Sequence, residues 1–255
     1  MTQTIGILGV GHFGGYLVEG LLRGDNAPRV ILSPRGAAKA KELSQRFGLE
    51  IAPDNQTVVD KSDVVLLATR PKDAAATVAA LRWREGQRLV IFAAGIRPAV
   101  LALGPAIGVR AMACAACAHG ESTVVIHPED AVTRDVLKSL GPVLTMPSEA
   151  ALEAGTVMYG YYAMMFGLME EGERWAKAQG IPDQAARDIV AWCFRGAGTM
   201  RLHDIKESLP DIVASLATPG GLTECGLNSL RSEDGIAAWG RAMDAQLRKV
   251  RGQDK

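Results

Sequence analysis

The sequence predicts an α/β fold: a mostly parallel sheet covered by helices in the first half of the chain, followed by an all-helical second half. Three observations predict it. A glycine-rich turn follows the first apolar run, short apolar runs alternate with helical segments as far as Pro147, and no strand pattern follows. With 255 residues, of which 48% are hydrophobic, the chain is long enough to bury a core in each half.

Four short apolar runs are predicted to be buried strands, at residues 4–8, 30–32, 64–68 and 89–93. Helices are predicted between them. Apolar residues recur at helical spacing after the glycine turn, which predicts the first helix. Residues 37–47 are rich in Ala, Lys and Glu and end at Gly48, which predicts the second. Pro71 can stand in the first turn of a further helix. Strands that alternate with helices in this way indicate a Rossmann-type sheet with helices on both faces.

The second half is predicted to be helical throughout. Ser148 and Glu149 are suitable first residues for a helix, because a hydroxyl can cap the free N–H groups and a carboxylate favours the positive end of the dipole. The predicted helices cover residues 150–179, 183–200, 205–214, 223–231 and 236–250. The sequence therefore predicts two domains, residues 1–149 and residues 150–255.

Composition limits the class of partner. Lys plus Arg equal Asp plus Glu, at 28 each, so no overall basic field would hold nucleic acid or an acidic membrane surface. No apolar stretch is long enough to span a bilayer, no secretion signal is recognisable, and the four cysteines form no disulfide framework. We expect a cytoplasmic protein whose partners are small molecules or copies of itself.

The glycine turn predicts a dinucleotide site. It reads Gly9-Val10-Gly11-His12-Phe13-Gly14, follows a predicted strand and opens a helix. Gly9 permits the tight turn, Gly11 lets the backbone approach a pyrophosphate, and Gly14 lets helix and strand pack closely. An incidental glycine-rich turn is the alternative, but the strand and helix around it are the context that the motif requires. The sequence therefore predicts a nicotinamide-dependent oxidoreductase.

The residues after the second predicted strand favour NADP over NAD. NAD-selective folds place a carboxylate there to bind the ribose 2′-hydroxyl, whereas this chain has Ser33-Pro34-Arg35. A hydroxyl and a guanidinium suit a 2′-phosphate. The alternative is that Arg35 is a solvated surface charge.

A second glycine loop, Thr218-Pro219-Gly220-Gly221-Leu222-Thr223, precedes a predicted helix. Its free N–H groups and the helix dipole would stabilise a carboxylate of the substrate. The alternative is a connecting turn in which Thr223 caps the helix.

These motifs together resemble the pyrroline-5-carboxylate reductase family, which reduces a cyclic imine to proline with NADPH. The resemblance covers most of the chain and also rests on Asp54-Asn55, Ala68-Thr69-Arg70-Pro71, Ala93-Ala94-Gly95-Ile96 and Arg110-Ala111-Met112. It implies that Asn55 contacts the adenosine side of the cofactor. It further implies that the ribose and nicotinamide are bordered by Ala68, Thr69, Arg70, Pro71, Ala94 and Gly95. Thr218, Gly221, Leu222 and Thr223 would hold the substrate carboxylate, with the Thr223 hydroxyl near the imine nitrogen as the catalytic group.

Two segments depart from the family pattern. Members usually carry Met-Pro-Asn-Thr-Pro where this chain has Met112-Ala113-Cys114-Ala115-Ala116, and Ser-Gly-Ser-Gly-Pro-Ala-Tyr where it has residues 158–164, with three tyrosines. We expect Tyr161 to contact substrate, with a core position as the alternative. Cys114 and Cys117 form a CxxC pair, but two thiols alone do not close a zinc site, and we expect no metal.

Three hypotheses therefore stay open: a pyrroline-5-carboxylate reductase, a paralogue that reduces a different or bulkier imine, and a non-catalytic NADP-binding regulator. The glycine loop at Pro219 argues against the regulator, which would have little need of it. The helical half has more apolar surface than its own core can bury, which predicts association through that half. The resemblance implies a homodimer through the C-terminal helices, with a higher homo-oligomer as the alternative.

Overall fold

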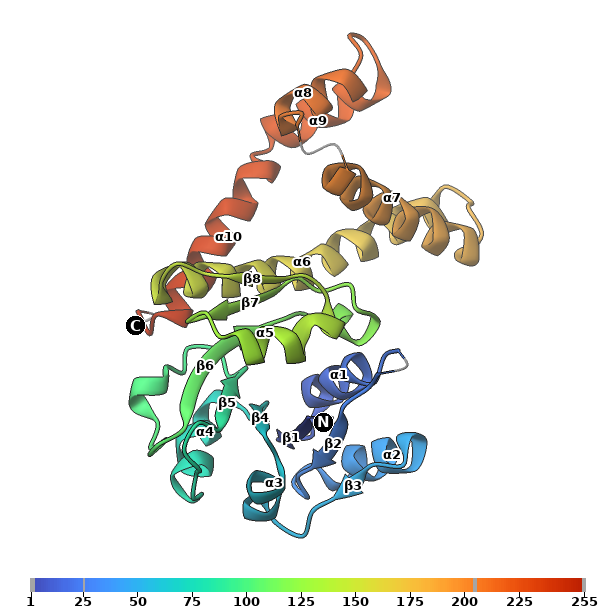
Figure 1. Ribbon diagram of the computed structural model, residues 1–255. Coiled ribbons are helices and arrows are strands. Elements are labelled where there is room, and N and C mark those ends of the chain that lie inside the picture. Colours follow the sequence, from blue (N-terminus) through green and yellow to red (C-terminus); the bar gives the residue numbers. More distant parts are fainter. Residues whose placement is uncertain (1–2, 25, 204–205, 254–255) are drawn as a thin grey trace. The chain divides into compact units, whose positions relative to one another are not determined.

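The computed structural model describes residues 3–24, 26–203 and 206–253 (Figure 1). Its contacts divide the chain into two compact units. The first runs as far as Tyr159 and includes the segment from Leu247, and the second is Gly160–Gln246. The predicted order, an α/β sheet followed by a helical half, is confirmed. Helix α6 begins at Glu149, after the last strand, and the compact units divide between Tyr159 and Gly160, within that helix.

The first unit contains one sheet of eight strands in the order β3-β2-β1-β4-β5-β6-β7-β8 (Figure 1). The strands from β1 to β6 pair in parallel, β7 is antiparallel to β6, and β8 is parallel to β7. Their bounds are β1 (Thr4–Leu8), β2 (Arg29–Leu32), β3 (Glu50–Ile51), β4 (Val64–Leu67), β5 (Arg88–Ile91), β6 (Ile107–Met112), β7 (Val124–His127) and β8 (Val143–Thr145). The order reverses at β1, and ligands of such sheets bind beyond the carboxyl ends of the strands at that point.

Helices cover both faces of the sheet. One buried core joins the sheet to α1 (His12–Leu21), α2 (Ala37–Phe47) and α5 (Ala131–Leu137), and a second joins it to α3 (Asn55–Lys61) and α4 (Pro71–Ala79). Three short 3-10 helices complete the unit, η1 (Pro98–Val100), η2 (Ala115–His119) and η3 (Lys138–Leu140). The strands β1, β4 and β5 are buried on both sides, as their uninterrupted apolar runs predicted.

Four strands were not predicted. β3 has only two residues, too few for any periodic signal, and β6 carries the buried Arg110 in its middle, which interrupts the apolar run. β7 and β8 are short and lie at one end of the sheet. These strands are fixed by their pairing with neighbours in the sheet, and pairing leaves little trace in a short local sequence.

The helices of the second half are α6 (Glu149–Ala178), α7 (Asp183–His203), α8 (Leu209–Leu216), α9 (Leu222–Ser232) and α10 (Gly235–Val250). The predicted helix at residues 205–214 begins at Leu209, where Ser208 caps it by accepting the Asp211 N–H, and Ile205 lies outside the described residues. Within the described residues no strand follows β8. No helix in the described part of the chain is long and apolar enough to cross a membrane.

Candidate functional site

The glycine turn joins β1 to α1, and at two of its three glycines a larger residue would collide with the backbone. Gly9 has a φ of 97°, and a Cβ there would lie 2.8 Å from the Thr69 backbone nitrogen. A Cβ on Gly14 would collide with the carbonyl oxygen of Gly9. By contrast, a Cβ on Gly11 would meet nothing within 4 Å, because this residue faces open space. The turn is therefore tight on its inner side and open toward a ligand on its outer side.

Two adjoining pockets lie at the carboxyl ends of β1, β2, β4 and β5. The first has a volume of about 270 Å³ and is lined by Gly9, Val10, Gly11, Arg35, Gly36, Ala68, Thr69, Arg70 and Asp73. The second has a volume of about 480 Å³ and is lined by Gly11, His12, Phe13, Ala68, Thr69, Arg70, Pro71, Phe92, Ala93 and Ala94. Segments that follow four strands thus meet around one site, at the place where a parallel sheet of this order binds its ligand.

The environment of Thr69 bears on whether these residues fit a dinucleotide. It lines both pockets, and its Oγ1 is buried with no hydrogen-bond partner among the described residues. A buried hydroxyl without a partner is unfavourable, and a ligand oxygen that enters the pockets would satisfy it. The open backbone at Gly11 and the free N–H groups at the start of α1 suit a pyrophosphate. The residues present therefore fit a dinucleotide cofactor.

Four residues predicted for the cofactor do not line either pocket: Gly14, Ser33, Asn55 and Gly95. Gly14 is packed under the turn, and Gly95 is exposed one residue beyond the pocket at Ala94. Asn55 begins α3, whose cap is the preceding Asp54, which accepts the Thr57 N–H at 2.7 Å.

Ser33 has a position that sequence reasoning missed. Its side chain is fully buried, and its hydroxyl accepts the Gly9 N–H at 3.0 Å. The hydroxyl therefore ties the end of β2 to the glycine turn and has no surface exposed to a ligand. Arg35, two residues further on, is exposed at the rim of the first pocket. Of this pair, only Arg35 is placed to meet a ligand directly.

Asp73 is the second residue that sequence reasoning missed. It is the one carboxylate among the residues lining the first pocket, and it pairs with Arg35 and with Arg70. The sequence did offer a signal for the position of Asp73. An acidic residue three positions after Arg70 falls in the first turn of the helix that begins at Pro71, where a carboxylate is favoured. What no local pattern could show was the pairing with Arg35, which is 38 residues away.

The second glycine loop lies in the second unit. Gly220 has a φ of 73°, the Gly221 N–H donates to the Thr218 carbonyl at 2.9 Å, and Gly221 is the residue before the first turn of α9. Thr223 is exposed within that first turn and is not the cap, so the capping alternative is wrong. The loop therefore presents an exposed hydroxyl beside the start of a helix.

Glu224 also takes part in this loop, and sequence reasoning missed it. Its Oε2 accepts the Gly220 N–H at 2.7 Å. A carboxylate of the chain itself thus occupies one of the N–H groups that were predicted to bind an anion. The signal was an acid at the third position of the helix, where a side chain reaches back to the N–H groups before the helix.

The tyrosines of α6 are divided between the two units. In the first, Tyr159 donates its hydroxyl to the Thr123 carbonyl at 2.7 Å, and burial raises its pKa. In the second, Tyr161 is 37% exposed and packs edge-on against Trp239, with ring centres 5.2 Å apart. Tyr159 is therefore a structural anchor, and Tyr161 keeps an accessible edge.

The CxxC pair lies at η2, where Cys114 is the residue before the helix and Cys117 is inside it. All four cysteines are free, and Cys117 is fully buried. Burial, and then the neighbouring Cys114, raise the pKa of Cys117 to about 12, so that the thiol stays protonated. Cys114 lies 3.4 Å from the Ser122 hydroxyl. Within the described ranges no three His, Cys, Asp or Glu side chains are grouped so that they could hold a metal ion.

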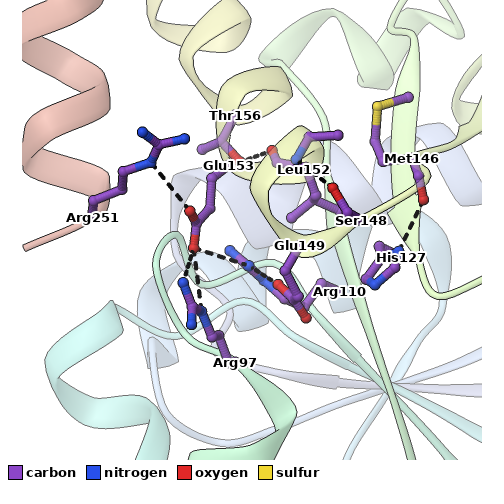
Figure 2. Close-up of polar contacts among 11 residues, drawn as sticks. Arg97, Arg110, His127, Met146, Ser148, Glu149, Leu152, Glu153, Thr156 and Arg251 are labelled. Atoms are coloured by element: carbon purple, nitrogen blue, oxygen red, sulfur yellow. Dashed lines mark hydrogen bonds and ion pairs between the residues drawn. The ribbon is translucent and has the colours of Figure 1, made fainter.

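A cluster of charged side chains lies in the first unit (Figure 2). Its members come from the loop after β5, from β6, from the first turns of α6 and from the segment after α10. Glu153 is 5% exposed and lies against three arginines, Arg97, Arg110 and Arg251. Burial alone would raise the pKa of Glu153, but the hydrogen bonds from Arg97 and the charges of all three arginines outweigh it and lower the pKa. Arg110 also pairs with Glu149, and its Nη2 is buried with no partner among the described residues.

Comparison with known proteins adds to this geometry. Two family models match the chain, "NADP oxidoreductase coenzyme F420-dependent" over residues 4–95 and "Pyrroline-5-carboxylate reductase dimerisation" over residues 149–252. A pyrroline-5-carboxylate reductase of Corynebacterium melassecola is 27% identical over an alignment 259 positions long, which covers 95% of each chain.

Two solved structures share the fold over almost the whole chain. The 1-pyrroline-5-carboxylate reductase from Streptococcus pyogenes superposes with a TM-score of 0.85 at 23% identity, covering 98% of this chain and 99% of that one. A pyrroline carboxylate reductase from Plasmodium falciparum, with NADP bound, gives a TM-score of 0.82 at 16% identity, covering 99% and 98%.

Proposed function

Because the chain belongs to the pyrroline-5-carboxylate reductase family of NAD(P)-dependent oxidoreductases, we propose that it reduces a cyclic imine carboxylate, 1-pyrroline-5-carboxylate, to proline with NADPH. The observation that carries the proposal is the pair of pockets around the glycine turn, with the unpartnered Thr69 hydroxyl between them. The reaction is a two-electron reduction of a C=N bond.

On the cofactor side, the open backbone at Gly11, His12 and Phe13 binds the pyrophosphate. Thr69 donates its hydroxyl to the ribose or phosphate oxygens, and Arg35 contacts the 2′-phosphate at the rim of the first pocket. Ala94 and Phe92 line the second pocket, where apolar walls suit a nicotinamide ring. Asn55 and Gly95 are assigned to the adenosine and nicotinamide ends on the family resemblance alone.

On the substrate side, the loop of the second unit holds the carboxylate through Thr218, Gly221 and Leu222. Thr223 lies in the first turn of α9 with its hydroxyl exposed, and it positions the proton of the imine nitrogen. When bound, a reduced nicotinamide supplies the hydride. An iminium accepts a hydride readily, so the contribution of the protein is mostly placement of the two reactants.

Residues 1–149 serve in this proposal as the NADP-binding domain, and residues 150–255 as the domain for dimerisation and substrate. The dimerisation model that matches residues 149–252 suggests a homodimer. Large apolar side chains of the second unit support it, since Trp192 is 65% exposed and Leu202 is 80% exposed. Light scattering of the purified protein would show a dimer, a higher homo-oligomer or a monomer.

A second candidate is a reductase of a different or bulkier imine. Glu224 favours it, because its carboxylate already occupies the Gly220 N–H and would repel a substrate carboxylate at the same loop. The accessible edge of Tyr161 also favours it, since aromatic side chains suit a larger apolar substrate.

One experiment separates these candidates. The loss of NADPH absorbance is followed with 1-pyrroline-5-carboxylate, with 1-pyrroline-2-carboxylate and with a panel of larger imines, beside a titration of NADPH binding. Fast turnover of 1-pyrroline-5-carboxylate supports the proposal, and a strong preference for a larger imine supports the second candidate. Tight NADPH binding without turnover of any imine would overturn both and leave a cofactor-binding regulator.

A further inference from the structure

We propose that Asp73 sets how strongly this protein prefers NADPH over NADH, by competing with the cofactor's 2′-phosphate for Arg35 and Arg70. The inference rests on the proposed use of NADPH and concerns the selectivity of that same site. It assigns to α4 a role that Rossmann-type folds usually give to the residue at the end of the second strand.

The two arginines share one oxygen of Asp73. The Oδ2 atom lies 3.1 Å from Arg35 Nη2 and 3.5 Å from Arg70 Nε. All three side chains line the first pocket, together with the open backbone at Gly11. The side chains of Arg35 and Arg70 are 58% and 73% exposed, whereas that of Asp73 is 24% exposed. The arginines are therefore accessible to a ligand, and the carboxylate lies between them.

Backbone contacts hold Asp73 in this place without help from the two guanidinium groups. The Asp73 N–H donates to the Arg70 carbonyl at 2.9 Å, and the Thr77 hydroxyl donates to the Asp73 carbonyl at 2.8 Å. Pro71 fixes the first helical residue of α4. The carboxylate is thus carried by an ordered helical turn, where it also faces the positive end of the helix dipole.

The residues at the end of β2 cannot by themselves discriminate between NADPH and NADH. An acidic residue at this place would reject a 2′-phosphate, but Ser33 is buried beneath the glycine turn and Arg35 is a cation. Among the residues that line the first pocket, Asp73 alone carries a negative charge. Asp73 is therefore the residue of this pocket whose charge can oppose a 2′-phosphate.

Charge decides the direction of the effect. Two arginines and one aspartate give the rim a net charge of one positive unit, and a 2′-phosphate would bring further negative charge beside Asp73. The phosphate must draw at least one guanidinium away from that carboxylate. NADH has no 2′-phosphate and is not opposed in this way. Asp73 therefore lowers the preference for NADPH and keeps NADH usable.

The test uses two nucleotides that differ in the 2′-phosphate and need no turnover. Adenosine 2′,5′-bisphosphate and adenosine 5′-monophosphate are titrated calorimetrically into the wild type and Asp73→Asn. The substitution keeps the size of the side chain and removes its charge. We expect the bisphosphate to bind about threefold more tightly to the variant, because ion pairs of accessible arginines contribute only weakly. Binding of the monophosphate stays unchanged, and high salt reduces the difference.

Asp135→Asn is the matched control. Asp135 is likewise an aspartate in an ion pair, with Lys138 at 2.5 Å, but it lines a different pocket with Gln3, at the amino end of β1. This variant removes the same charge from the protein without touching the first pocket, and neither nucleotide should bind differently.

Unchanged or weaker binding of the bisphosphate by Asp73→Asn would overturn the proposal that Asp73 competes with the 2′-phosphate. Weaker binding would mean instead that Asp73 orients the arginines for the phosphate. Arg35→Gln separates this failure from failure of the proposed NADPH preference. If Arg35→Gln weakens bisphosphate binding while Asp73→Asn does not strengthen it, only the role of Asp73 is wrong. If Arg35→Gln has no effect either, the NADPH preference is wrong as well.

Discussion

Arg97 donates two hydrogen bonds to a single oxygen of Glu153, from Nε at 3.2 Å and from Nη2 at 2.5 Å (Figure 2). The buried Arg110 lies 4.0 Å from the same oxygen, and Arg251 lies 3.5 Å from the other one. One carboxylate on the first turns of α6 thereby ties together the loop after β5, the strand β6 and the end of the chain beyond α10. This cluster belongs to the unit that carries the dinucleotide pockets.

Glu153→Gln is expected to destabilise the first unit by about 3 kcal/mol, because it removes a buried carboxylate that three arginines share and leaves the buried Arg110 with Glu149 alone. Chemical denaturation followed by circular dichroism measures the loss. Glu171→Gln is the control, since Glu171 pairs with Arg174 on an exposed surface and its removal should change stability by less than about 0.5 kcal/mol. Equal effects of the two substitutions would show that the cluster around Glu153 contributes no more to the free energy of unfolding than an exposed ion pair does.

Stability should fall in acid partly through Glu153. Its pKa in the folded protein is below the ordinary value of 4.5, so the folded state binds fewer protons than the unfolded state. The stabilisation is complete above pH 4.5 and is lost as the pH falls through the lowered pKa. The difference in unfolding free energy between wild type and Glu153→Gln should therefore shrink below about pH 4.5. A difference that stays constant down to pH 3 would contradict this assignment.

Two glycine substitutions should have separable effects. Gly14→Ala pushes a Cβ into the Gly9 carbonyl, so the turn must shift, and we expect a loss of about 1 to 3 kcal/mol in stability. Gly11→Ala meets nothing within 4 Å, so stability should stay unchanged while the methyl group projects toward the cofactor and weakens its binding. Thermal unfolding and NADPH titration measure the two effects. Full NADPH affinity in Gly11→Ala would remove this residue from the pyrophosphate site.

Thr223→Ala should lower turnover about tenfold to a hundredfold while leaving NADPH affinity within about twofold. The reason is that the exposed hydroxyl belongs to the substrate loop and is not among the residues lining the cofactor pockets. Steady-state kinetics and NADPH titration measure the two quantities. Ser229→Ala, an exposed hydroxyl further along α9, is the control and should keep full turnover. Unchanged turnover in Thr223→Ala would remove Thr223 from the site.

Cys117 should resist alkylation in the folded protein. Its thiol is fully buried, and its pKa is raised to about 12, so almost no thiolate exists at pH 8. Mass spectrometry after iodoacetamide treatment should find Cys193 and Cys225, which are exposed, modified first. Unfolding in urea should make Cys117 react at the same rate as they do. Rapid labelling of Cys117 in the native protein would show that η2 opens readily.

Much of the fold could be read from local patterns. The run at residues 4–8, the glycine turn and the following helix were predictable because each rests on its own spacing of apolar and glycine residues. The four strands that escaped prediction are two to six residues long, and the strand-forming signal of β6 is broken by Arg110. Pairing in the sheet and the salt bridge to Glu149 make that arginine acceptable in the interior.

The candidate site, too, has features that local sequence patterns predict and features that depend on tertiary contacts. By itself, the sequence determined that a glycine turn opens a helix after the first strand, that the second half is helical and that a second glycine loop precedes a helix, since each depends on neighbours along the chain. Only the tertiary structure decided that Ser33 supports the turn from beneath and that Asp73 stands between Arg35 and Arg70. It also decided that Glu153 faces three arginines. Those relationships depend on which strand ends lie side by side, and strand order is a property of the whole sheet.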